Sequence, residues 1–69
     1  MERHNLYMFR CDKKLTQAEI SKMCGVSRSS YANIEQGRRD GTMKFWDKFQ
    51  EVFNISDSDL RKLRKREQQ

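Results

Sequence analysis

The side chains of this chain that could carry out chemistry are few, and they do not combine into a catalytic or metal site. Cys11 and Cys24 are its two cysteines, they form no CxxC pair, and His4 is its single histidine. A structural zinc site needs cysteine or histidine ligands in paired spacing, and a hydrolytic triad would need His4 beside a supported nucleophile. We therefore expect no enzyme activity, no metal and no small-molecule cofactor, and two reduced cysteines.

Residues 28–36 carry polar side chains that suit hydrogen bonding to a partner and not catalysis or metal binding. At about 100° per residue, a helix over this segment turns Tyr31 and Ile34 to one side. The opposite side carries Arg28, Ser29, Ala32, Asn33 and Gln36, without a carboxylate. Arginine, serine and asparagine can read base edges in the major groove of DNA, and the small Ala32 allows a close approach. The pattern predicts a helix whose outer side chains contact DNA bases. The alternative is an ordinary amphipathic helix whose polar face lies in solvent.

The charge of the chain favours the same kind of partner. Fifteen lysines and arginines against ten acidic residues give a net charge of +5, and a domain this basic attracts polyanions. The excess is spread along the chain except for one run at residues 61–66. The longest apolar stretch, Leu6 to Phe9, is far shorter than the roughly 20 residues of a membrane span. We expect a cytoplasmic protein that binds double-stranded DNA and no membrane.

The elements that must position these side chains are predicted to be helices, because the chain has no proline and three glycines. The expected fold class is all-α, a compact domain of five helices. Thr16 and Glu19 fit a capping box, and Gly25 fits a helix end. Asn5, Ser27 and Ser56 are expected as further N-caps. The expected helices cover about residues 5–13, 16–24, 27–36 and 43–53, and a short stretch after Ser56. The second and third, joined at Gly25-Val26, form a helix-turn-helix over about residues 16–36.

The series Leu15-Thr16-Gln17-Ala18-Glu19-Ile20, Cys24-Gly25-Val26-Ser27 and Ile34-Glu35-Gln36-Gly37-Arg38-Arg39 resembles the Cro/cI-type (XRE) helix-turn-helix family of phage repressors. The resemblance covers about residues 5–60. It implies a five-helix, lambda-repressor-like domain that regulates transcription, usually represses it, and binds a palindromic operator as a homodimer. Residues 1–60 would form this DNA-binding domain, and residues 61–69 a basic C-terminal tail.

The resemblance also implies roles for individual residues. Its pattern places DNA base contacts at Gln17, Ser27, Arg28, Ser29 and Asn33. Contacts to the DNA backbone are expected from Gln17, Gln36, Arg38, Arg39 and Lys44. Arg10 and Glu35 match a pair that forms a structural salt bridge between the first and third helices. The loop Asp40-Gly41-Thr42 departs from the family pattern by one additional residue.

The apolar residues near the C-terminal end of the sequence suggest how two copies could associate. After a five-helix core is filled, Ile55, Leu60 and Leu63 are left over and are expected at a dimer interface. A second kind of function stays open, an antitoxin or adaptor module that uses the same fold to bind a protein partner. A large exposed apolar patch around Trp46 or Leu63 would favour that alternative.

Overall fold

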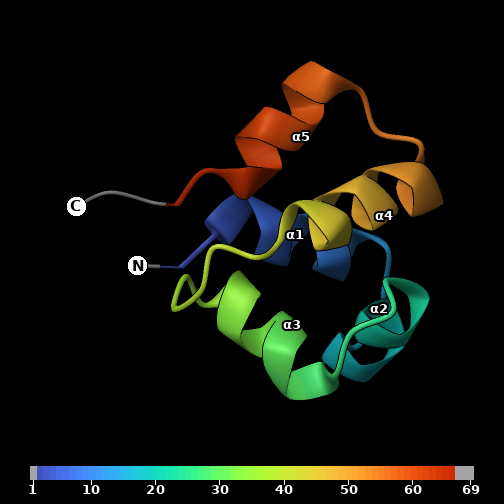
Figure 1. Ribbon diagram of the computed structural model, residues 1–69, viewed down its shortest axis with the longest axis vertical. Helices are drawn as coiled ribbons and strands as arrows, with labels where there is room; N and C mark the ends of the chain where they lie inside the picture. Colours follow the sequence, from blue (N-terminus) through green and yellow to red (C-terminus); the bar gives the residue numbers. More distant parts are fainter. Residues whose placement is uncertain (1, 67–69) are drawn as a thin grey trace.

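The computed structural model describes residues 2–66, and within this range the chain forms five α-helices and no strand (Figure 1). The helices are α1 (His4–Asp12), α2 (Gln17–Met23), α3 (Arg28–Glu35), α4 (Met43–Phe53) and α5 (Asp57–Arg64). The predicted all-α, five-helix fold is therefore confirmed. Arg61 to Arg64, the first part of the basic run expected as a tail, belong to α5, and residues 67–69 of that tail lie outside the described residues.

The helices α1 and α4 lie between the other three. Figure 1 shows α2 and α3 together on one side of this pair and α5 on the other, and the rings of Phe9 on α1 and Phe49 on α4 have centroids 5.5 Å apart. The helices α2 and α3 pack against each other, while α1 contacts both α3 and α5. The start of α1 and the end of α5 lie on the same side of the molecule, beside the loop that joins α3 to α4.

Four of these helices have a serine or threonine as N-cap. Thr16, Ser27, Thr42 and Ser56 each accept a hydrogen bond from the backbone N–H three residues later. Thr16 and Glu19 form the reciprocal pair of a capping box, with the Thr16 backbone N–H donating to Glu19 Oε1 at 2.8 Å. The N-caps predicted at Thr16, Ser27 and Ser56 are confirmed, because each hydroxyl satisfies a backbone donor that the helix leaves free.

The predicted start of the first helix is wrong. Its N-cap is Arg3 and not Asn5, and no side chain caps it. The Arg3 backbone N–H instead donates to the carbonyl of Glu35 at 2.8 Å. A contact with α3 therefore sets where α1 begins, and the amide of Asn5 donates to the carbonyl of Lys62 on α5 at 3.3 Å.

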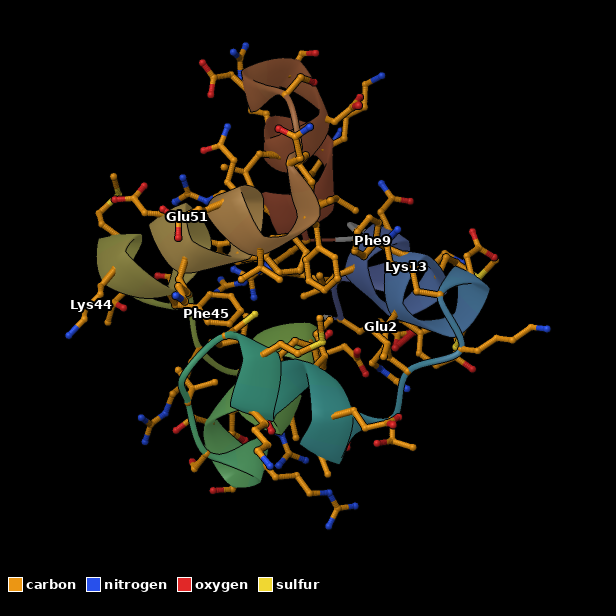
Figure 2. All side chains as sticks on the ribbon, turned by 90° about the vertical axis from the view of Figure 1, so that its right-hand side faces the viewer. Glu2, Phe9, Lys13, Lys44, Phe45 and Glu51 are labelled. Carbon is orange, nitrogen blue, oxygen red and sulfur yellow. The ribbon has the colours of Figure 1, made fainter. Side chains whose placement is uncertain are left out.

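The core is rich in aromatic side chains and draws residues from all five helices. The largest fully buried side chains are Trp46, Tyr31, Phe49, Leu6 and Ile20. Phe45, directed inward from α4 in Figure 2, is 3% exposed and lies edge-on to Trp46 with ring centroids 4.9 Å apart. Cys24 is part of this core, and burial raises the pKa of its thiol to about 11, so the thiol stays protonated.

Two residues expected at a dimer interface lie in the core of the single chain. Leu60 and Leu63 are 8% and 9% exposed, and both belong to the hydrophobic cluster. The helix α5 packs on α1 through this face, so these side chains are not left over for a second copy. Ile55, the third of the set, is partly buried against the same core. The expectation for Leu60 and Leu63 is corrected for this reason.

Candidate nucleic-acid interface

The turn between α2 and α3 fixes the two helices at a tight corner. Gly25 adopts a φ of +73°, a left-handed conformation that side chains disfavour. The Val26 backbone N–H donates to the carbonyl of Ser21 at 3.0 Å, which closes the end of α2. Ser27 then caps α3. The helix-turn-helix predicted over about residues 16–36 is therefore present, with α3 as its second helix.

The outward side of α3 is the one predicted from its periodicity. Tyr31 and Ile34 are 0% and 4% exposed and pack inward. The residues expected to face DNA lie on the outer side: Arg28, Ser29 and Gln36 are exposed, and Asn33 is half-buried. Arg28 has no carboxylate partner among residues 2–66. Its guanidinium is therefore available to an external acceptor.

The hydroxyl groups at the start of α3 differ in what they leave free. The Ser27 hydroxyl accepts from the Ser30 backbone N–H at 3.1 Å and donates to the Ser30 hydroxyl at 2.9 Å. It is thus engaged within the chain. Ser29 is exposed, with one long contact of 3.4 Å to Ser27. Of these two expected base-contacting residues, Ser29 offers the freer hydroxyl.

A buried ion pair holds α3 against α1. Arg10 Nε donates to Glu35 Oε2 at 2.8 Å and Arg10 Nη2 to Oε1 at 3.2 Å. The Tyr31 hydroxyl donates to the same carboxylate at 2.8 Å, and Gln17 Nε2 at 3.0 Å. A third Arg10 donor, Nη1, reaches the carbonyl of Leu15 at 2.8 Å. This network joins the first three helices through one carboxylate.

The pKa values of this network follow from its hydrogen bonds. Burial by itself raises the pKa of Glu35, but hydrogen bonds from Arg10, Tyr31 and Gln17 together outweigh it and hold the pKa below its ordinary value. The hydrogen bond to Glu35 raises the pKa of Arg10. Burial, and then the charge of Glu35, raise the pKa of Tyr31. The carboxylate is therefore charged and the phenol protonated at neutral pH.

Gln17 lies at the first position of α2, and the network determines what it can offer to DNA. Its side-chain nitrogen is bound to Glu35, so the amide is fixed in one orientation. The amide oxygen is left for an external donor. The Gln17 backbone N–H lies in the first turn of α2, where helices have no internal acceptor and bind anions.

The loop between α3 and α4 carries the cations expected to contact the DNA backbone. The backbone N–H groups of Arg38 and Arg39 both donate to the carbonyl of Asn33, at 2.9 and 3.2 Å. Their side chains are exposed. Lys44, in the first turn of α4, is also exposed and is directed away from the body in Figure 2. The three cations thus border the C-terminal end of α3 and the start of α4.

The centre of this loop is held by a core residue. Gly41 has a φ of +81°. The indole Nε1 of Trp46 donates to the carbonyl of Asp40 at 2.8 Å. The loop backbone is therefore hydrogen-bonded from both sides, since Asn33 binds its start and Trp46 its centre.

Arg3 also holds this loop, and no pattern in the sequence predicts that role. Arg3 is 3% exposed, although it lies two residues from the chain start. Its guanidinium donates to three carbonyls of α3 and the loop: Ile34 at 2.6 Å, Arg39 at 2.8 Å and Asp40 at 3.3 Å. Its Nε donates to the carbonyl of Arg64 at 2.8 Å. No sequence signal marks this role, because a terminal arginine normally lies in solvent.

Among the described residues, none of the helices combines the length and apolar character that crossing a bilayer requires. Within residues 2–66, no three histidine, cysteine, aspartate or glutamate side chains gather in a way that could hold a metal ion.

Comparison with known protein families matches residues 6–60 to the family described as Helix-turn-helix. Comparisons with curated proteins and with solved structures return no match. The matched segment contains all of α2, α3 and α4, and therefore the turn and the exposed face of α3. Members of this family bind DNA and are not catalytic. The chain therefore belongs to the Cro/cI-type (XRE) helix-turn-helix family, and it is a DNA-binding domain.

Proposed function

We propose that this protein is a sequence-specific transcriptional regulator of the repressor type, which binds a palindromic operator as a homodimer. In this proposal α3 of each copy enters the major groove of one half-site. The observation that carries it is the outer face of α3, where Arg28 and Ser29 are exposed at the helix start. Such a helix start is the part of a recognition helix that reaches base edges.

The proposed contacts divide into base reading and backbone positioning. Base contacts are assigned to Gln17, Ser27, Arg28, Ser29 and Asn33. Backbone contacts are assigned to Gln17, Gln36, Arg38, Arg39 and Lys44. The division follows the family resemblance: the outer side of α3 would face the groove, and Gln36 and the exposed cations around the loop would face the phosphates. Gln17 has both roles, since its backbone N–H suits an anion and its side-chain oxygen is free.

The homodimer is proposed because a single recognition helix reads only a few base pairs. Two copies related by a two-fold axis would read two half-sites about 34–36 Å apart. With Leu60 and Leu63 in the core, Ile55 at the turn between α4 and α5 is the member of the expected set that keeps some exposure. We therefore propose the surface around Ile55 as part of the contact between copies.

Selection of bound duplexes from a random library tests the sequence preference and the symmetry together. The expected result is an inverted repeat with half-sites one helical turn apart. Sedimentation of the protein on the selected duplex should give two chains per site. A single, non-repeated site that binds one chain would contradict the dimer while leaving DNA recognition intact.

The dependence of affinity on salt tests whether DNA is the main partner. If each chain neutralises about three or four phosphates, the logarithm of affinity should fall with the logarithm of salt by about 0.9 per phosphate.

Placing the selected site across a promoter in a reporter assay distinguishes repression from activation. Lower transcription in the presence of the protein is the expected result.

A protein-binding module, such as an antitoxin or adaptor, remains the second candidate for comparison. It would give no enriched duplex and an affinity for DNA that changes little with salt. The apolar residues that could have favoured it, Trp46 and Leu63, are 1% and 9% exposed and belong to the core. The structure therefore offers this alternative no apolar patch at either residue.

A further inference from the structure

The end of α5 meets the start of α1 and the loop after α3 at a cavity with an unusual lining. The cavity has a volume of about 400 Å³ and is lined by Arg3, Asp40, Arg64, Lys65 and Arg66. Four of these five residues are cationic and one is acidic. The basic cavity, as we call this group of five residues, lies on the side of the molecule where the start of α1 and the end of α5 lie beside the loop that joins α3 to α4 (Figure 1).

The positive charge of the basic cavity is only partly balanced. Asp40 pairs with Arg66 and lies 3.8 Å from Arg3 Nη2, but its side chain is 80% exposed, so water screens its charge. Arg64 and Lys65 have no carboxylate partner among residues 2–66. Arg66 Nε is buried and has no hydrogen-bond partner within the same range. An anion in the cavity would therefore meet unpaired donors and an excess of positive charge.

The cations are brought together by specific contacts. Arg3 donates to the carbonyl of Arg64, which fixes the end of α5. The guanidinium carbons of Arg3 and Arg64 lie 5.5 and 5.4 Å from the centre of the Trp46 ring system. Burial lowers the pKa of Arg3, and the charges of Arg66 and Arg64 lower it further although Asp40 opposes them. The lowering of the Arg3 pKa by Arg66 and Arg64 means that these like charges lie close together.

We propose that the basic cavity binds a phosphate group of the DNA backbone, next to the phosphates assigned to Arg38 and Arg39. The cavity is continuous with the loop, because Arg3 Nη1 donates to the carbonyl of Arg39. Guanidinium groups match the geometry of phosphate oxygens, and Lys65 adds a point charge. The inference rests on the proposed function, and it gives the basic C-terminal segment a direct part in DNA binding.

The test compares two double variants of α5 and its end that remove the same charge. R64Q/K65Q removes two cations of the basic cavity, whereas R61Q/K62Q removes two exposed cations one turn earlier on the same helix. Neither change touches a backbone carbonyl, so the hydrogen bond from Arg3 to Arg64 can form in both. Affinity for the selected duplex is measured from low to high salt for the unmodified chain and both variants. Thermal melts confirm that each variant folds.

The expected result separates the two variants by slope. Loss of this phosphate contact in R64Q/K65Q makes the dependence of log affinity on log salt shallower by about 0.9 for each chain, because each neutralised phosphate contributes about 0.9. Each lost contact weakens binding about eightfold at 0.1 M salt relative to 1 M. R61Q/K62Q should keep the slope of the unmodified protein. Equal slopes for the two variants would overturn the inference, since general charge loss would then explain any change.

Fluorescence of Trp46, the single tryptophan of the chain, gives an independent measurement. Two guanidiniums of the cavity adjoin its ring, so binding of a phosphate there should alter its emission. Duplex DNA should produce this change in the unmodified protein and in R61Q/K62Q, and should fail to produce it in R64Q/K65Q. Sodium phosphate at matched ionic strength is titrated in parallel. A full emission change with phosphate alone would identify free phosphate, and not DNA, as the ligand.

The failure of this inference is distinguishable from failure of the proposed function. If the unmodified protein selects no duplex and shows no salt dependence, the proposed function is wrong. If it binds DNA with the expected slope and R64Q/K65Q matches it, only the role of the basic cavity is wrong.

Discussion

Arg3 Nη1 lies 2.6 Å from the carbonyl oxygen of Ile34, so the start of the described chain is hydrogen-bonded to the last turn of α3. A cation at this position is favoured by the negative end of the α3 dipole. The same atom reaches the carbonyl of Arg39 at 2.8 Å. One side chain near the start of the chain thus holds the loop where it leaves α3.

Arg3→Met should destabilise the domain by about 2–4 kcal/mol, because it removes the donors of several carbonyls that are partly shielded from water. In a domain of this size, that lowers the melting temperature by about 10 °C or more. The matched control is Arg38→Met at an exposed arginine, which should stay within about 0.5 kcal/mol of the unmodified protein. Equal melting of the two variants would show that the Arg3 contacts carry no stability.

Glu35→Ala should cost about 3–5 kcal/mol, because it leaves the Arg10 guanidinium, 14% exposed, without its partner. Glu51→Ala is the control, since Glu51 is 78% exposed and its 3.8 Å pair with Lys48 lies on the surface. That change should cost less than about 1 kcal/mol. Denaturant unfolding at neutral pH measures both. A loss for Glu35→Ala no larger than that for Glu51→Ala would contradict a structural role for the pair.

The stability given by Glu35 should disappear in acid. Its pKa is lower in the folded chain than its ordinary value of 4.5, so the unfolded chain takes up this proton first as pH falls. The stabilisation is complete above pH 4.5 and is lost as pH falls through the folded value. Glu35→Gln lacks the titration and leaves the other carboxylates in place. The difference in unfolding free energy between the two proteins should therefore shrink below about pH 4, and a constant difference would argue against the assignment.

Gly41→Ala should destabilise the chain more than Gly25→Ala. Both glycines have positive φ, +81° and +73°, so both substitutions incur a backbone strain of about 1–2 kcal/mol. A Cβ at position 41 would also lie 2.8 Å from Trp46 Nε1, whereas one at position 25 meets nothing within 4 Å. The added loss at position 41 should come with altered Trp46 emission. Equal losses of unfolding free energy for the two variants would mean that the loop moves enough to accommodate the added Cβ at position 41.

Arg28→Lys should weaken binding to the selected duplex by about 1–3 kcal/mol and change binding to mixed-sequence DNA little. Lysine keeps the charge but loses the fork that binds O6 and N7 of guanine. Arg39→Lys is the control at an exposed arginine assigned to the backbone, and it should alter neither affinity by more than a few fold. Equal weakening of Arg28→Lys on both DNAs would assign Arg28 to phosphate contact.

The sequence by itself determined the local design of the helix-turn-helix. Thr16 and Ser27 begin α2 and α3 as expected, and the side of α3 that holds Tyr31 and Ile34 is buried as its periodicity requires. These features could be predicted because a cap or a helix face depends on residues three or four positions apart. The Arg10–Glu35 pairing followed from the family resemblance, since no local rule relates residues 25 positions apart.

Tertiary structure alone decided the features that depend on distant segments. Arg3 bonds to carbonyls 31, 36 and 61 positions away, so nothing near it in the sequence indicates that it is buried. Leu60 and Leu63 were expected to be left over for a second copy, but both are buried in the core of the single chain, and their helix α5 packs against α1. The physical reason is the same in each case: burial is determined by which element packs on a side chain, and that element can lie anywhere along the chain.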